Sequence, residues 1–191
     1  MPTLITGASG AIGFLVCREL RAQGVSVRVL IDPPDADRLV APLESLGCEA
    51  IVANTAVATP ALAKHFFKVE RVLLHVGCTI DLDVRESTLV RVAQETSRPH
   101  IVKVSPPAAR ADSGRDWARA HAAGEMVLRD SGLPWTIVKP ASLMQNLLLA
   151  REGIRQRGEL ALPLGEAKIN LIDVRDVAHV LTHVLTHSGH H

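Results

Sequence analysis

A glycine-rich segment near the N-terminus has the residue types and spacing that can hold a phosphate group. Residues 6–13 read Thr-Gly-Ala-Ser-Gly-Ala-Ile-Gly. Gly7 permits a tight turn, Gly10 lets the backbone approach a pyrophosphate, and Gly13 lets a helix pack closely on a strand. The free N–H groups at the start of that helix favour an anion. Between a strand and a helix, the segment predicts a dinucleotide site rather than an ordinary turn.

An acidic residue follows where dinucleotide-binding proteins hold the adenosine ribose. Asp32 comes nineteen residues after Gly13, at the end of a β-branched run. A carboxylate there accepts hydrogen bonds from ribose hydroxyls and repels a 2′-phosphate, which favours NAD(H). Two alternatives stay open. Pro33-Pro34 would also suit a turn or helix-capping aspartate, and the nearby Arg28 and Arg38 leave NADP(H) open as the cofactor.

These residues need a frame of alternating strands and helices, and the hydrophobic periodicity predicts one. Strands are expected at residues 4–6, 25–31, 50–52, 71–76, 101–104, 135–139 and 168–171. Helices are expected at residues 11–23, 35–46, 60–67, 82–95, 112–130, 143–151 and 173–186. Such an alternation forms right-handed βαβ units and a parallel sheet covered on both faces. We therefore expect an α/β fold with a doubly wound parallel sheet, as one domain over residues 1–191.

Composition narrows the classes of protein that fit. The chain has 21 Lys plus Arg against 20 Asp plus Glu, so its formal net charge of +1 favours neither nucleic acid nor an anionic membrane as a partner. No apolar run reaches the roughly 18 residues of a membrane span. The three cysteines lie far apart, which argues against a disulfide framework and favours a cytoplasmic location. The chain contains no tyrosine.

With the glycine segment in place, the chain resembles the atypical short-chain dehydrogenases/reductases of the NmrA-like type. The segments that carry the resemblance are His-Ala-Ala-Gly-Glu at 121–125, Ser-Gly-Leu-Pro-Trp-Thr-Ile-Val-Lys-Pro at 131–140, Met-Gln-Asn at 144–146 and Ile-Asp-Val-Arg-Asp-Val-Ala at 172–178. The resemblance runs from Thr3 to about Leu185. It implies a Rossmann domain with strand order 3-2-1-4-5-6. Members normally continue into a small lobe that closes over the substrate. We expect this lobe to be largely missing here, either because the sequence is truncated at its C-terminus or because the lobe is absent and the substrate side is open.

The resemblance also implies a set of cofactor contacts. The pyrophosphate would lie on the glycine segment, at Gly7, Ser9, Gly10, Ala11, Ile12 and Gly13. The adenosine half would lie along the ends of the second, third and fourth strands, at Asp32, Asn54, His75, Val76 and Gly77. The nicotinamide half would be flanked by Ser105, His121, Pro140, Ala141 and Ser142. Many members have an arginine at the position of Asp32, and this departure also favours NAD(H).

The catalytic position departs from the wider superfamily, which uses Tyr-x-x-x-Lys on the helix after the fifth strand. The matching pair here is Trp117 and His121. Tryptophan is no proton donor at neutral pH, whereas histidine titrates there. His121 is therefore the candidate for holding the nicotinamide ribose, acting as acid/base, or both, against the alternative of an ordinary polar helix position. Ser105 is the candidate for orienting a carbonyl, or it simply ends a strand. Trp117 is expected in the core or in a pocket wall.

The last predicted helix raises the question of a metal site. His179, His183 and His187 recur every four residues, and His190-His191 end the chain. Because no acidic or cysteine partners are near in the sequence, we expect a solvated helix face and no metal. Asp173 is the expected N-cap of this helix.

Three functional hypotheses follow. The leading one is an NAD(P)-dependent oxidoreductase that transfers hydride to or from a small carbonyl or quinone-like substrate. A quinone suits the missing tyrosine, because it takes hydride without a strong general acid. The second hypothesis is a non-catalytic NAD(P)(H)-binding redox sensor that acts through a regulatory protein partner. The third is an isomerase or epimerase with tightly bound NAD, which would also need an acid/base. A homodimer through the helices beside the sixth strand is a further expectation.

Overall fold

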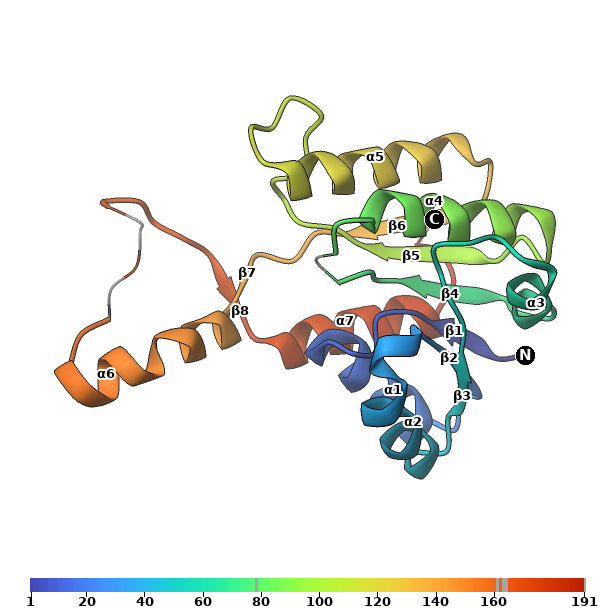
Figure 1. Ribbon diagram of the computed structural model, residues 1–191, viewed down its shortest axis with the longest axis horizontal. Coiled ribbons are helices and arrows are strands. Elements are labelled where there is room, and N and C mark those ends of the chain that lie inside the picture. Colours follow the sequence, from blue (N-terminus) through green and yellow to red (C-terminus); the bar gives the residue numbers. More distant parts are fainter. Residues whose placement is uncertain (78, 161, 163–164, 191) are drawn as a thin grey trace.

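Six parallel strands form the central sheet of the computed structural model, which describes residues 1–77, 79–160, 162 and 165–190 (Figure 1). The strands are β1 (Thr3–Ile5), β2 (Val27–Ile31), β3 (Glu49–Val52), β4 (Arg71–Leu74), β5 (His100–Val104) and β6 (Trp135–Val138). Their order is β3-β2-β1-β4-β5-β6, and every neighbouring pair is parallel. The predicted fold class and strand order are thus confirmed. The order reverses between β1 and β4, and ligands of such sheets bind outside the strand ends at that point.

Helices cover both faces of the sheet (Figure 1). On one face lie α1 (Ala11–Ala22), α2 (Ala36–Ser45) and α7 (Val174–Thr186), and on the other lie α3 (Pro60–Ala63), α4 (Leu82–Glu95) and α5 (Asp116–Asp130). Each layer buries its own apolar stripe against the sheet. Val16 and Leu181 are fully buried in the first layer, and Ala93 and Leu128 in the second. The four inner strands β2, β1, β4 and β5 are largely buried from both sides, as their apolar runs predict, whereas the edge strands β3 and β6 are only partly buried.

Several element ends differ from the predictions. β4 ends at Leu74 instead of residue 76, and α5 begins at Asp116 instead of residue 112. The helix predicted over 60–67 is α3 followed by a 3₁₀ turn, Lys64–Phe66. A 3₁₀ turn over Pro33–Asp35 also precedes α2.

The N-termini of α2 and α7 differ in whether an aspartate side chain caps the helix. Asp35 stands before α2, but its carboxylate pairs with Arg38 at 2.8 Å and makes no capping hydrogen bond. This helix start therefore has no side-chain cap. The predicted cap of α7 is confirmed, because the Asp173 carboxylate accepts a hydrogen bond from the Arg175 backbone N–H at 2.8 Å.

Within residues 140–172, the described parts 140–160, 162 and 165–172 leave the sheet as an arm (Figure 1). The arm holds β7 (Ser142–Leu143), a 3₁₀ stretch (Met144–Ala150), α6 (Arg151–Arg157) and β8 (Leu171–Ile172), and β7 pairs with β8 in parallel. The helix predicted over 143–151 is a 3₁₀ stretch that runs into α6, and the strand predicted over 168–171 is shifted to Leu171–Ile172. Apolar side chains of the arm stay in solvent, with Leu148 63% and Leu149 88% exposed. The helical pattern here has no apolar surface to pack on within the described chain.

Two composition-based expectations concern cysteines and membranes. Cys17 and Cys48 are buried and free of disulfides, while Cys78 and His191 lie outside the described residues. Over the part of the chain that the structure describes, no helix has the length and apolar character needed to cross a membrane.

Candidate dinucleotide-binding site

Two of the three glycines in the N-terminal segment are required by the fold itself. Gly7 has φ +71°, and a Cβ there would overlap the backbone carbonyl oxygen of His75 at the end of β4. A Cβ on Gly13 would stand 2.5 Å from the Gly7 carbonyl oxygen. Thr6 holds the same corner, since its hydroxyl accepts from the His75 N–H at 3.0 Å and donates to the Leu73 carbonyl at 3.0 Å. These contacts fix the turn that joins β1 to α1.

Gly10 differs, because the protein leaves its side-chain position open. Its φ is −93°, and the nearest heavy atom to an added Cβ is the Gly7 carbonyl oxygen at 3.7 Å. Gly10 is also the N-cap of α1, where it offers no capping side chain, and the first turn of the helix contains no acidic residue. The positive end of this helix is therefore neither capped nor neutralised. The open position and the free N–H groups fit a pyrophosphate.

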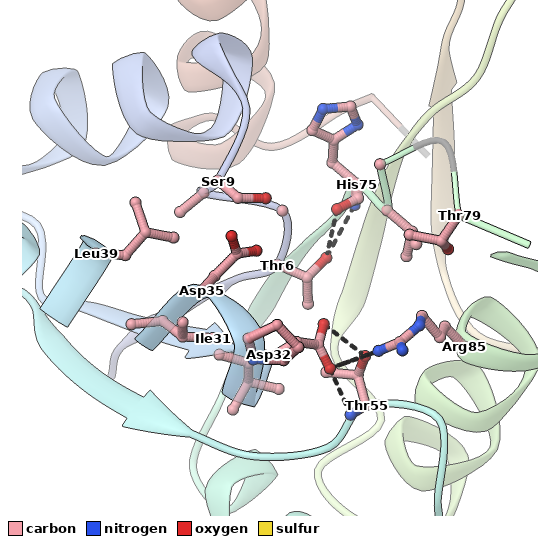
Figure 2. A pocket seen from close by; sticks show the side chains of 16 residues that line it. Thr6, Ser9, Ile31, Asp32, Asp35, Leu39, Thr55, His75, Thr79 and Arg85 are labelled. Atoms are coloured by element: carbon pink, nitrogen blue, oxygen red, sulfur yellow. Dashed lines mark hydrogen bonds and ion pairs between the residues drawn. The ribbon is translucent and has the colours of Figure 1, made fainter. Parts of the chain in front are cut away.

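A cavity of about 200 Å³ lies beside this turn, at the carboxyl ends of β1, β2 and β4 (Figure 2). Predicted cofactor residues in its wall are Gly7, Ser9, Asp32, His75, Val76 and Gly77. Gly10 and Ala11 line an adjoining hollow that shares Ser9 with the cavity. Ile12 is buried, 6% exposed, and supports the turn from behind together with Gly13.

Asp32 reaches the cavity from the end of β2 and is held there by two neighbours (Figure 2). Its Oδ1 accepts hydrogen bonds from the Thr55 N–H at 3.1 Å and the Thr55 hydroxyl at 3.0 Å. Arg85 of α4 forms an ion pair with the same oxygen at 2.5 Å. The Asp32 side chain makes no capping hydrogen bond to the turn that follows it. The alternative of a helix-capping aspartate is therefore wrong.

Three other sequence candidates occupy different places. Arg28 pairs with Glu49 at 2.8 Å and donates to the His65 carbonyl at 2.6 Å. It sits early in β2, away from the strand end that carries Asp32, so its part in the NADP(H) alternative is wrong. Arg38 lines the adjoining hollow. The Asn54 side-chain oxygen accepts from the Ala56 N–H at 2.9 Å in a local turn.

Sequence reasoning missed Thr55 and Arg85 as cavity residues. Thr55 directly follows Asn54, and the one-residue shift places it in the wall in place of its neighbour. Arg85 comes from α4, on the far side of the strand-order reversal, 53 residues from Asp32 in the sequence. Only the folded sheet brings these two charges together. An arginine near the start of an amphipathic helix is common, so the sequence alone does not indicate that Arg85 lines a cavity.

The residues predicted around the nicotinamide lie in a separate buried polar cluster beside β5 and α5. Ser105 is 1% exposed, and its hydroxyl donates a hydrogen bond to Glu125 Oε1 at 2.6 Å. Lys139 pairs with the same oxygen at 2.8 Å. Burial opposes ionisation of Glu125, but the hydrogen bonds from Lys139 and Ser105 outweigh it and lower the pKa of this carboxyl. Ser105 is therefore already engaged with a carboxylate.

Three further predicted residues follow β6. Pro140 and Ala141 lead into the arm, and Ser142 pairs with Leu171 across β7 and β8. None of the three lines the cavity at the glycine turn.

His121 lies on α5, one turn before Glu125, and is 8% exposed. Its Nδ1 is buried without a hydrogen-bond partner among the described residues and stands 3.8 Å from Glu86 Oε1. Burial, and then the charge of Lys103, lower the pKa of His121 to about 4. The expectation that this histidine titrates near neutral pH is thus wrong, and the imidazole is neutral at pH 7.

Trp117 does not lie in the core. It is 39% exposed and lies in the first turn of α5, with the Arg115 guanidinium 5.9 Å from its ring centroid. This exposure contradicts the expectation of a core tryptophan, and the pocket-wall alternative stays a prediction.

Behind His121 lies a buried ion pair that the sequence did not reveal. Lys103 of β5 pairs with Glu86 of α4, and both side chains are fully buried. Burial raises the pKa of Glu86 to about 7 against the opposing charge of Lys103. Gly124 makes room for the pair, since a Cβ there would overlap Glu86 Oε2. Gly124, within the His-Ala-Ala-Gly-Glu segment, was the one sequence feature that could have indicated close packing at this position.

The histidines of α7 form an exposed stack. The rings of His183 and His187 lie 4.0 Å apart between centroids, and His187 also contacts the His183 carbonyl at 3.0 Å. Among the described residues, no group of three or more His, Cys, Asp or Glu side chains is placed to hold a metal ion.

The sheet order, the glycine turn and the cavity at the order reversal define a Rossmann-type dinucleotide-binding protein. A family model described as NAD(P)H-binding matches residues 7–188, and the chain belongs to this family. The predicted resemblance to NmrA-like atypical short-chain dehydrogenases/reductases is thereby confirmed.

Two curated relatives match almost the whole chain. An NAD(P)H azoreductase from Xenophilus azovorans is 29% identical over 187 residues, which are 98% of this chain. A (4-alkanoyl-5-oxo-2,5-dihydrofuran-3-yl)methyl phosphate reductase from Streptomyces griseus is 33% identical over 188 residues, also 98% of this chain. The chain spans 64% of the length of each of these relatives.

Solved structures share the fold. The Citrobacter triphenylmethane reductase complexed with NADP(H) superposes with a TM-score of 0.82 at 24% identity, over 100% of this chain and 67% of that one. The NADPH-dependent quinone oxidoreductase of Escherichia coli superposes with a TM-score of 0.83 at 22% identity, over 98% of this chain and 66% of that one.

Proposed function

We propose that this protein is an NAD(P)H-dependent reductase that passes hydride to a small quinone-like or carbonyl acceptor. The observation that carries the proposal is the open position at Gly10 above an uncapped helix start, beside a cavity that holds Asp32. The names of the azoreductase and the Streptomyces reductase, both related over 98% of this chain, favour reduction as the reaction class.

The cofactor contacts in this proposal follow the cavity. The pyrophosphate lies on the turn Gly7–Gly13, with the N–H groups of α1 as donors. The Asp32 carboxylate takes the adenosine ribose. Its Oδ1 is engaged by the Thr55 N–H, the Thr55 hydroxyl and Arg85, whereas Oδ2 is contacted by the Thr55 hydroxyl at 3.1 Å, so Oδ2 is the less occupied acceptor for a ribose hydroxyl. We propose that NADH is bound through this contact. The nicotinamide half extends towards His121 and Ser105.

The acceptor class follows from the protonation state of His121. A bound NAD(P)H supplies the hydride, and reduction of a quinone to its hydroquinone also takes up one proton. His121 is neutral at pH 7 because its pKa is lowered to about 4, so it is a weak proton donor there. The chain has no tyrosine to replace it. A quinone draws its proton from water once hydride has arrived, and we therefore favour it over an aldehyde. His121 and Ser105 then position the reactants.

Oxidation of NADH and NADPH with a panel of quinones and aldehydes tests this proposal. We expect turnover with quinones, and a fall in kcat of about tenfold in His121→Ala, the size of a positioning effect at a reacting centre. His179→Ala, on the exposed face of α7, is the matched control and should leave kcat unchanged. Binding of dinucleotide without turnover of any acceptor would overturn the reductase proposal.

That outcome would favour a second candidate, a non-catalytic NAD(P)(H) sensor. Two observations favour it. Ser105 is 1% exposed and its hydroxyl is already hydrogen-bonded to Glu125, and the sequence contains no tyrosine. A sensor needs the cavity but no proton donor. Its regulatory protein partner would bind with unequal affinity to the two redox states of the dinucleotide.

Homodimer formation and a cytoplasmic location stay predictions. The free thiols of Cys17 and Cys48 support the second, since reducing compartments keep cysteines unpaired.

A further inference from the structure

We propose that Arg85 decides how strongly this site discriminates between NADH and NADPH, by partly neutralising Asp32 from the opposite wall of the cavity. The inference rests on the proposed placement of the adenosine ribose at Asp32. It adds a specificity-determining residue on α4, outside the β2–α2 segment from which the ribose contacts of such folds come.

The geometry places Arg85 between two carboxylates. Its Nε pairs with Asp81 Oδ1 at 2.9 Å, and its Nη1 pairs with Asp32 Oδ1 at 2.5 Å and donates to the Thr55 hydroxyl at 2.9 Å. The side chain is 18% exposed, so the guanidinium is fixed by packing as well as by hydrogen bonds. Nη2 takes part in neither ion pair. Figure 2 shows the guanidinium approaching Asp32 and Thr55 from the α4 side of the cavity.

The ion pair changes what Asp32 does to a 2′-phosphate. An uncompensated carboxylate repels this dianion, which is the usual basis for preferring NADH. Here a guanidinium offsets part of the Asp32 charge within hydrogen-bond distance and is shared with Asp81, so the repulsion is weakened but not removed. The Asp32 Oδ2 oxygen still accepts from a ribose hydroxyl. The site therefore accepts NADH through Asp32 and tolerates NADPH through Arg85.

Arg38 is the rival for this role. It lines the hollow beside Gly10 and pairs with Asp35 at 2.8 Å. Its side chain is 61% exposed, so solvent screens its charge far more than that of Arg85. The Arg38 guanidinium pairs with Asp35, whereas the Arg85 guanidinium donates a hydrogen bond directly to Asp32. The burial and the contact favour Arg85.

Titration of the wild-type protein with NADH and with NADPH, followed by fluorescence, measures the ratio of the two Kd values. We expect the wild-type values to lie within about tenfold of each other, since a partly neutralised carboxylate discriminates weakly. Arg85→Gln should raise the Kd for NADPH by about tenfold or more and change the Kd for NADH by less than about threefold. Asp32→Asn should shift the ratio the other way.

Controls separate charge from structural damage. Arg91→Gln, an exposed arginine on the same helix, should leave both Kd values unchanged. The double variant Asp32→Asn/Arg85→Gln should regain NADPH binding relative to Arg85→Gln, because no bare carboxylate remains. This double variant keeps the test valid if the single change weakens folding.

Three results would overturn the inference. Arg85→Gln could weaken both dinucleotides equally, it could leave the ratio unchanged, or Arg38→Gln could produce the shift instead. In each case dinucleotide binding would stand and only the assignment to Arg85 would fall. If the wild-type protein bound neither dinucleotide, the proposed function itself would fall with it.

Discussion

At the residue scale, the three glycines of the N-terminal turn serve two purposes that the structure separates. Gly7 and Gly13 are required because backbone atoms occupy the space where their side chains would stand. Gly10 is not required for that reason, because nothing lies closer than 3.7 Å to its side-chain position. The sequence spacing predicted all three as one motif. Within that motif, Gly7 was expected to permit the turn and Gly13 to permit close packing, and the contacts at both positions agree with this.

Alanine substitutions test this separation through the free energy of unfolding. Gly13→Ala should destabilise the protein by about 1–3 kcal/mol, because its Cβ forces the turn apart. Gly10→Ala should change stability by less than about 1 kcal/mol. Urea denaturation of both variants measures the difference. Equal destabilisation by the two substitutions would contradict the assignment.

The buried Lys103–Glu86 pair is a second residue-scale feature. Lys103→Met removes the cation and leaves Glu86 buried without its partner, which should cost about 3–5 kcal/mol. The double variant Lys103→Met/Glu86→Leu removes both charges and should recover much of that loss. Chemical denaturation of the single and double variants checks this. A double variant no more stable than the single one would argue against an uncompensated charge as the cause.

At the element scale, the sequence predicted the core elements well and the arm poorly. β2, α1 and α4 follow runs whose apolar residues are buried against the sheet, so period and packing agree. The segment 143–151 has a helical period but no sheet to pack on, and it adopts β7 and a 3₁₀ stretch instead. Hydrophobic periodicity therefore predicts a helix or strand correctly only where the apolar face can be buried in the folded protein.

The same limit applies to the candidate site. The glycine turn and Asp32 are close in sequence to the strands that position them, so their spacing was informative. Thr55 reaches Asp32 from the end of the neighbouring strand β3, Arg85 reaches it across the strand-order reversal, and Glu86 reaches Lys103 from a helix of the second layer. His121 was found by resemblance, but its neutrality depends on burial beside Lys103, which spacing does not reveal.

The N-terminus of α7 offers a test at this scale. Asp173 caps the helix through the Arg175 N–H. Asp173→Ala should cost about 1 kcal/mol, because a helix-end donor loses its partner. Thermal or urea unfolding measures it. Asp176→Ala, in the first turn of the same helix, is the matched control and should cost less than half as much. Equal losses would assign the effect to general charge at the helix start.

At the scale of the whole molecule, two buried histidines make stability depend on pH. His75 and His121 both have their pKa lowered to about 4, chiefly by burial. The unfolded chain therefore binds more protons than the folded one between about pH 6.5 and pH 4. Their contribution to stability is fully present above about pH 6.5 and is lost as pH falls towards 4. Glu86, with its pKa raised to about 7, acts in the opposite direction over part of this range.

His121→Gln isolates one histidine from that balance. Between pH 6.5 and pH 4.5 the variant should lose less stability than the wild-type protein, by on the order of 1 kcal/mol. The exposed His179→Gln should follow the wild-type curve. Urea midpoints across this pH range give the comparison. Parallel curves for His121→Gln and wild type would show that His121 is not held neutral in the folded state.

The central claim is that the turn at Gly7–Gly13 and the cavity beside it bind a nicotinamide dinucleotide. The most direct test is a calorimetric titration of NADH and NADPH into the wild-type protein and into Gly10→Ala. We predict saturable binding of dinucleotide by the wild-type protein, with affinity at least about tenfold weaker in Gly10→Ala, since its added Cβ occupies the space left for the pyrophosphate. Equal binding by the two proteins, or binding of neither dinucleotide by the wild type, would contradict the claim.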